Sequence, residues 1–222
     1  MIILGITLIL SVAVVFVYKA SAPETRIRIR IVMAVMLLLT DVIKYSIIII
    51  THGDLKNYLP LEICSLAEYC ILFDSLQKTN TFVTEMLLIV FLPAAIMALI
   101  FPTTITLPLC NFFTIHQFAY HGLIVAYVLS RFFAGEINMS YKGVWLSILT
   151  TFIIAMIVYV IDRKNNTNFM FLIHDEKNAM LQKISGLCGE GVRYTAGLIF
   201  TCIIGIHISY FLFKILEMIF LK

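Results

Sequence analysis

The sequence predicts an all-α protein: a polytopic membrane helix bundle of about seven transmembrane helices, with one short amphipathic helix on its outer surface. Of the 222 residues, 61% are hydrophobic and only 13% are charged, whereas a soluble domain is about half apolar and about a quarter charged. The apolar residues also gather in runs of about 20, the length that crosses a bilayer. We therefore treat residues 1–222 as a single integral membrane domain.

Composition also limits the possible partners and cofactors. The net charge of +3 is too small to suggest nucleic acid. Five cysteines in no short-range framework do not indicate a disulfide scaffold. The chain contains no HxxxH or HExxH pattern, so we expect neither a metal site nor a cofactor. The expected partners are membrane lipids.

Hydropathy places the spans, and the first of them needs a decision. Ala20-Ser21-Ala22 resembles a signal-peptidase site, but the basic residues follow the apolar run instead of preceding it. We therefore interpret the first segment as a retained span, with a cleaved signal peptide as the alternative. The predicted spans are residues 1–18, 31–51, 59–77, 82–101, 111–133, 143–161 and 195–217.

The distribution of basic residues predicts the orientation. Arg26, Arg28 and Arg30 follow the first span, and basic residues of short loops concentrate on the cytoplasmic side. We expect a multi-pass protein of the cell membrane with its N-terminus outside and its C-terminus in the cytoplasm.

The long connection 162–194 carries the pattern of a short amphipathic helix. Asp175 and Glu176 precede Met180, Leu181, Ile184 and Leu187, whose spacing puts apolar residues on one face. We expect this helix to lie flat on the outer surface as a lid on the bundle.

Ionisable residues inside spans are costly and usually face a partner or a cavity. Asp41 and Lys44 lie three apart in the second span and favour a neutralised pair that ties two helices together. His207 lies in the middle of the last span and favours a hydrogen-bonded packing histidine.

The third span carries carboxyl and thiol groups near its start. Pro60 suits the first turn of a helix, where its missing N–H costs nothing. Cys64 and Glu68 are four apart and share a face. Glu62 is expected near the outer interface, as a solvated acid at the helix start or as a functional group.

The fifth span carries two histidines, His116 and His121. Gln117 and His121 lie four apart and point the same way, and Gly122 permits close approach of another helix. A cysteine on one helix and a histidine on another can form a nucleophile and its base. These residue types equally fit a buried apolar cysteine and hydrogen-bonded packing histidines.

Three short motifs carry a resemblance to a known family. They are LPLEICSLAEY (59–69), FAYHG (118–122) and NTNFMFL (166–172). In order and spacing the chain resembles the YwaF-like bacterial integral membrane proteins, related to the eukaryotic transmembrane protein 164 group, from about residue 25 onward.

The resemblance implies a six- or seven-span protein and, from its eukaryotic branch, acyl transfer between phospholipids by a membrane Cys and His. The implied catalytic residues are Cys64 and His121, and the polar pair after the sixth span falls on Thr167 and Asn168. Relatives commonly carry His at the position of Glu62, so a carboxylate stands where that histidine could assist.

Together these features predict a lipid acyltransferase or transacylase that uses a Cys–His pair. The predicted substrate-binding residues are Glu62, Glu68, His116, Gln117 and Asn168. The choice between His116 and His121 as the partner of Cys64 stays open, because His116 lies at the more suitable depth. The alternatives are a non-enzymatic membrane carrier and an accessory subunit of a membrane complex.

Overall fold

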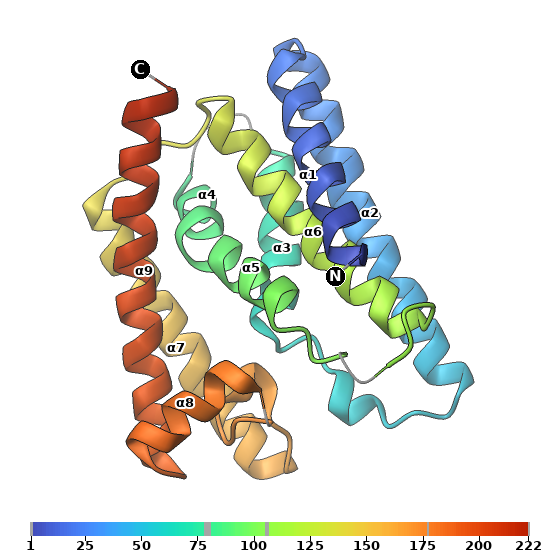
Figure 1. Cartoon of the computed structure of the whole chain (residues 1–222), viewed down its shortest axis with the longest axis vertical. Helices are drawn as coiled ribbons and strands as arrows, with labels where there is room; N and C mark the ends of the chain where they lie inside the picture. The colour runs from blue at the N-terminus through green and yellow to red at the C-terminus, as the bar shows by residue number, and fades with distance from the viewer. Residues whose placement is uncertain (1, 78–80, 105–106, 177, 222) are drawn as a thin grey trace.

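The computed structural model describes residues 2–77, 81–104, 107–176 and 178–221, and every regular element among them is helical. The long helices run back and forth between two ends of a bundle, and α8 lies across one end (Figure 1). One flank consists of α1 (Ile2–Ala20) and α2 (Pro23–Ile50). The other consists of α7 (Tyr141–Asn165) and α9 (Val192–Phe220).

The centre of the bundle holds four shorter pieces of chain and one long helix. These are α3 (Ile63–Ser75), α4 (Phe82–Met86), η2 (Leu87–Phe91), α5 (Leu92–Ile100) and α6 (Phe112–Phe133). Their buried apolar side chains form the main core. The flanking helices expose their outer apolar faces, as expected for surfaces that meet lipid.

Among the described residues, six helical stretches are long and apolar enough to cross a membrane, and they match six of the predicted spans. They are α1, α2, the continuous stretch Phe82–Ile100, α6, α7 and α9. The protein is therefore a multi-pass membrane protein. The remaining predicted span, 59–77, is the 13-residue helix α3, which at 1.5 Å per residue covers only about 20 Å.

The shortness of α3 corrects the expectation for Pro60. The helix begins at Ile63, with Glu62 as its extended N-cap residue, so Pro60 precedes the helix. Proline favours an extended conformation in the residue before it. A short 3-10 helix, η1 (Leu55–Tyr58), occupies the chain just upstream.

The fourth span contains a π-helical turn, η2, directly before Pro93. The Leu92 N–H donates to the Leu87 carbonyl, five residues back. A proline donates no hydrogen bond and crowds the carbonyl four residues earlier, so a wider turn before it relieves the clash.

The α1–α6 contact depends on Gly122. A Cβ atom at this position would lie 2.4 Å from Thr7 Cγ2 on α1. The Ser11 hydroxyl on α1 donates to the Gly122 carbonyl at 3.2 Å. The expected close approach of a neighbouring helix at Gly122 is confirmed.

The connection between α7 and α9 contains η3 (Phe169–Phe171) and the amphipathic helix α8 (Ala179–Cys188). The Asn178 side chain caps α8 by accepting from the Met180 and Leu181 N–H groups. Leu181 and Ile184 are buried in a second apolar cluster, whereas Leu187 is exposed. The predicted amphipathic helix is therefore confirmed. Its buried face ends at Ile184, one turn before Leu187, the last apolar residue of the predicted pattern.

Candidate functional site

Cys64 is the second residue of α3, so it lies at the positive end of a helix. The Glu62 side chain does not cap the first-turn amides of α3, because its Oε2 instead accepts from the Met170 N–H at 2.9 Å. First-turn N–H groups have no partner within their own helix, and together with the helix dipole they favour negative charge. Burial opposes this effect and raises the pKa of the Cys64 thiol to about 12, so Cys64 rests as a thiol and needs a base to become a nucleophile.

Glu62 joins the start of α3 to the η3 connection. Burial raises the pKa of its carboxyl to about 7, against the opposing effect of the hydrogen bond from Met170. The expectation of a freely solvated acid is therefore wrong, because the η3 segment folds over this side chain. Sequence alone does not reveal a contact between residues 108 positions apart.

Tyr120 connects α6 to the start of α3. Its hydroxyl lies 2.8 Å from Glu68 Oε2 and 3.1 Å from the Cys64 carbonyl oxygen, so its single proton is shared between two acceptors. Tyr120 is the ninth residue of α6, whereas Cys64 is the second of α3. With both helices running in the same direction, α3 begins deeper in the bundle, by on the order of 10 Å (Figure 1).

Around Tyr120 lies a group of ionisable side chains, here called the polar core: Asp41, Lys44, Glu68, His116 and Tyr120. Lys44 Nζ lies 2.6 Å from Asp41 Oδ1, and His116 Nε2 lies 3.4 Å from the same oxygen. The Asp41 and Glu68 carboxyl groups lie near enough to affect each other electrostatically. The His116 ring stacks on Tyr120 with centroids 5.3 Å apart.

The polar core requires a proton besides the charge of Lys44. Two neighbouring buried carboxyl groups cannot both be ionised at low cost when one cation is available. A proton on one of the two carboxyl groups removes the second negative charge. The polar core is therefore a place where a proton can be held.

His121 and Gln117 lie on the side of α6 that faces α5. Gln117 Nε2 donates to the Ala98 carbonyl at 3.2 Å. His121 Nδ1 lies 2.6 Å from the Gln117 carbonyl, a contact that requires a proton on Nδ1 and leaves Nε2 as the basic nitrogen. The His121 ring meets the Tyr120 ring edge-on, with centroids 5.6 Å apart.

The two histidines thus flank the ring whose hydroxyl touches Cys64. Within the described parts of the chain, neither imidazole is hydrogen-bonded to the Cys64 thiol. The pairing of Cys64 with His121 stays a prediction, as does the alternative with His116.

Asn168 organises the η3 connection. Its Oδ1 accepts from the Ile173 and His174 N–H groups, and its Nδ2 donates to the His174 carbonyl and to Glu176 Oε1. These bonds fix the connection that brings Met170 to Glu62. Asn168 therefore acts on the start of α3 through the backbone of η3.

Three members of the polar core were not predicted as site residues. Asp41 and Lys44 form the expected ion pair, but the pair also contacts His116 and Glu68, which ties α2 to α3 and α6. The sequence offers one indication that Tyr120 belongs to the site: it lies four residues after His116, so both residues are on one helix face. In the described residues, no group of three or more His, Cys, Asp or Glu side chains could hold a metal ion.

Comparison with known proteins identifies the family. No curated protein and no solved structure matches the chain. The model of the TMEM164 family matches residues 1–212, which include α3, the polar core and most of α9. The chain therefore belongs to the TMEM164 family.

Proposed function

We propose that the protein transfers acyl chains between lipids through a thioester on Cys64. The observation that carries this proposal is the position of Cys64 in the uncapped first turn of a recessed helix, beside the polar core. The first-turn amides of α3 are suited to stabilise the oxyanion that forms when a thiol attacks an ester carbonyl.

The proposed reaction has two balanced halves. The Cys64 sulfur attacks an ester carbonyl of a donor phospholipid, while a histidine takes the thiol proton. The ester C–O bond breaks, the histidine returns the proton to the leaving alkoxide, and a lysolipid departs. An acceptor hydroxyl then attacks the thioester, its proton passes to the histidine, and Cys64 leaves as a thiol.

We assign His121 as the proton carrier. Its Nδ1 contact with the Gln117 carbonyl keeps Nε2 available as a base. His116 is engaged with Asp41, and we assign it to holding the polar core. The family resemblance implies the same choice.

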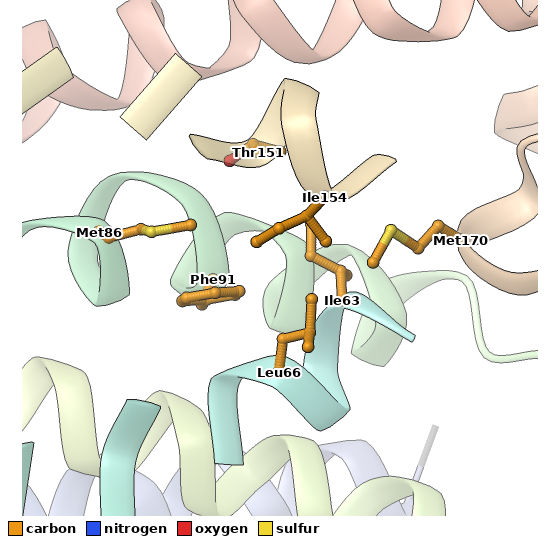
Figure 2. A pocket seen from close by; sticks show the side chains of 7 residues that line it. All are labelled: Ile63, Leu66, Met86, Phe91, Thr151, Ile154 and Met170. Carbon is orange, nitrogen blue, oxygen red and sulfur yellow. The ribbon is translucent and has the colours of Figure 1, made fainter. Parts of the chain in front are cut away.

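An apolar crevice beside α3 offers a route for the acyl chain (Figure 2). It is lined by Ile63 and Leu66 of α3, Met86 and Phe91 of the fourth span, Thr151 and Ile154 of α7, and Met170. Its volume is about 10 Å³, room for about one water molecule. An acyl chain therefore requires α7 to move away from α3 before the crevice can hold it.

The burial of Cys64 favours a second candidate function. Its side chain is only 9% exposed, and the adjacent crevice is narrow. A non-enzymatic carrier or accessory subunit would use the polar core as a structural or binding element and leave the thiol unmodified.

Lipid exchange by purified protein distinguishes the two functions. In vesicles with a labelled phospholipid and an unlabelled lysophospholipid, the wild type is expected to move label to the acceptor. Cys64→Ala should abolish transfer, whereas Cys70→Ala should retain it, because Cys70 lies on the same helix away from the uncapped turn. Equal transfer by both variants, or none by the wild type, favours the carrier or accessory role.

We also propose that the α8 end of the bundle faces outward. The first turns of α2, which carry Arg26, Arg28 and Arg30, lie at the end of the bundle opposite α8 (Figure 1) and favour the cytoplasm. A C-terminal tag labelled by an impermeant reagent in intact cells would contradict this orientation.

A further inference from the structure

A second polar site lies outside the polar core, where α8 crosses the end of the bundle (Figure 1). A partly open cavity of about 220 Å³ is lined by the chain after η3, by α8 and by the start of α9. Its polar lining consists of His174, Asp175, Ser185, Glu190 and Tyr194. The volume corresponds to about seven water molecules, enough for a small polar molecule.

The backbone between α8 and α9 brings this lining together. Gly189 and Gly191 have φ values of 87° and 62°, in a region that favours glycine. The chain turns at these two residues between α8 and α9, so that Glu190 and Tyr194 line the same cavity as Ser185 of α8.

Two carboxyl groups, of Asp175 and Glu190, line the cavity. The Ser185 hydroxyl donates to Asp175 Oδ2 at 2.7 Å and orients that carboxylate. Glu190, on the turn into α9, is exposed and forms no ion pair with any described residue. The neighbouring basic side chains Lys183 and Arg193 do not line the cavity.

Tyr194 supplies an independent indication of a ligand. Its side chain lines the cavity and is 1% exposed. Its hydroxyl is buried without a hydrogen-bond partner in the described parts of the chain. Buried hydroxyl groups nearly always have a partner, so an orphan beside a cavity marks a place for a ligand or water.

We propose that this cavity binds a small organic cation through a primary ammonium group. The three N–H donors of an ammonium match three acceptors: the carboxylates of Asp175 and Glu190 and the hydroxyl oxygen of Tyr194. A metal ion fits less well, because the described side chains include no cluster of metal-binding groups. The imidazole of His174, at the rim, is held by Asn168 and Glu176 and is not needed as a ligand.

Calorimetric titration of the full chain in phosphatidylcholine nanodiscs tests the proposal, with ethanolamine as the probe. Ethanolamine is expected to bind saturably, whereas ethylene glycol and tetramethylammonium are not. Ethylene glycol lacks the charge, and tetramethylammonium lacks the N–H donors. Absence of saturable ethanolamine binding, or equal binding of tetramethylammonium, overturns the proposal.

Two variants locate the site. Glu190→Gln should weaken ethanolamine binding about tenfold or more, since it removes a charged hydrogen bond. Tyr194→Phe, which retains the ring, should weaken it by a smaller factor. Glu24→Gln, an exposed change in the first turn of α2, serves as the control. Binding that is unchanged in both cavity variants places the site elsewhere and contradicts the assignment.

Changing the lipid of the nanodiscs shows whether the ammonium group belongs to a lipid headgroup or to a water-soluble molecule. If lipid headgroups reach the cavity, nanodiscs that contain an aminophospholipid should compete with soluble ethanolamine. If the natural ligand comes from water, the soluble affinity should stay unchanged; either result leaves the ammonium site in place. Cys64→Ala should also leave it unchanged, so the test is independent of the proposed acyl transfer.

Discussion

At the residue scale, the candidate site is organised by Tyr120. Its hydroxyl contacts Glu68 and the Cys64 carbonyl, and its ring contacts both His116 and His121. One side chain therefore links the nucleophile's backbone, a buried carboxyl group and two possible bases. This arrangement requires the recessed start of α3, because otherwise Cys64 and Tyr120 would lie at different depths.

Replacing each histidine separately tests the assignment of the base. His121→Ala should reduce acyl transfer by about 100-fold or more, the usual effect of losing a general base. His116→Ala should reduce transfer less and lower thermal stability instead, because Asp41 loses a neighbour. Initial rates of label transfer and melting curves check both. The reverse ranking of the rates would move the base to His116.

Glu62 should make stability depend on pH. Its pKa is about 7 in the folded protein, against 4.5 as the ordinary value. Between these values the unfolded chain releases the proton while the folded protein keeps it, so the folded state binds more protons. Stability should therefore fall as pH rises from 4.5 to about 7.

Melting curves of wild type and Glu62→Gln across this range check the prediction. The uncharged variant should lose this component, so the wild type should lose stability relative to it as pH rises. A constant difference between the two proteins at every pH would show that Glu62 titrates normally.

At the element scale, hydropathy predicted where helices occur but not at which residue α3 begins. Residues 59–77 are apolar enough to predict a full span, yet the chain first forms η1 and an extended Glu62 and starts the helix at Ile63. The contact of Glu62 with Met170 helps to hold that start in place. Such a contact depends on tertiary packing, which composition and periodicity do not encode.

The sequence predicted the close helix contact at Gly122, and substitution of this glycine tests how tightly α1 and α6 pack. Gly122→Ala should destabilise the protein by about 1–3 kcal/mol, since the added methyl group collides with Thr7. Gly205→Ala in α9 is the control, because a Cβ there meets nothing within 4 Å.

Thermal or denaturant unfolding of both variants measures the difference. Thr7→Ala combined with Gly122→Ala should recover part of the loss, since it removes the colliding methyl. Equal stability of the two glycine variants would contradict the close contact.

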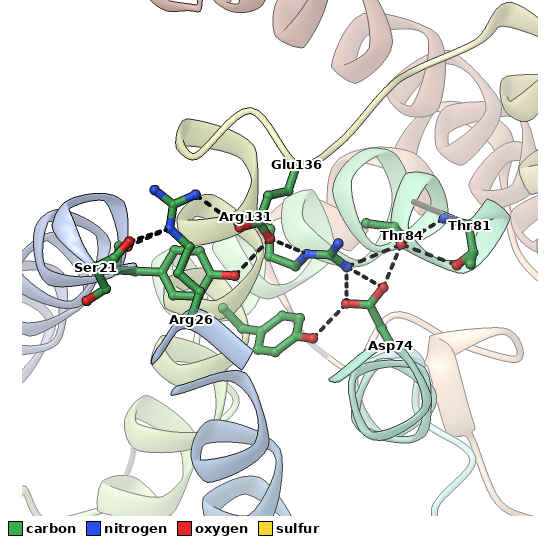
Figure 3. Close-up of polar contacts among 9 residues, drawn as sticks. Ser21, Arg26, Asp74, Thr81, Thr84, Arg131 and Glu136 are labelled. Carbon is green, nitrogen blue, oxygen red and sulfur yellow. Dashed lines mark hydrogen bonds and ion pairs between the residues drawn. The ribbon is translucent and has the colours of Figure 1, made fainter. Parts of the chain in front are cut away.

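At the scale of the whole molecule, a second polar network joins five helical elements at the end opposite Cys64 (Figure 3). Arg131 forms a buried ion pair with Asp74, which also accepts from Tyr127 and Thr84. Glu136 links Arg131 to Arg26 of α2 and Tyr18 of α1; neither end of the Asp74–Arg131 pair is more than 2% exposed.

This network shows where sequence-based prediction stops. Arg26 served only as a marker of the cytoplasmic side, and Asp74 carried no signal. The Asp74–Arg131 partners are 57 positions apart, and only the packing of α3 against α6 brings them together. The same holds for the polar core, in which each helix contributes one or two groups.

Breaking the buried pair should destabilise the whole bundle. Asp74→Asn should cost about 3–5 kcal/mol, because it leaves the Arg131 charge buried without a carboxylate. Glu217→Gln, at the more exposed pair with Lys214, should cost less than about 1 kcal/mol. Unfolding of the two variants under identical conditions compares these effects. A similar small loss in both would mean that Arg131 finds another partner.

The central claim is that Cys64 carries an acyl group during lipid transfer. Intact-protein mass spectrometry after incubation with phospholipid, followed by peptide mapping, tests it most directly. A mass increase equal to one acyl chain is expected on the peptide that contains Cys64, and hydroxylamine should remove it, as it does other thioesters. It should be absent in Cys64→Ala and retained in Cys70→Ala. The absence of any hydroxylamine-labile adduct under conditions where lipid exchange is observed, or its location on another cysteine, would contradict the account.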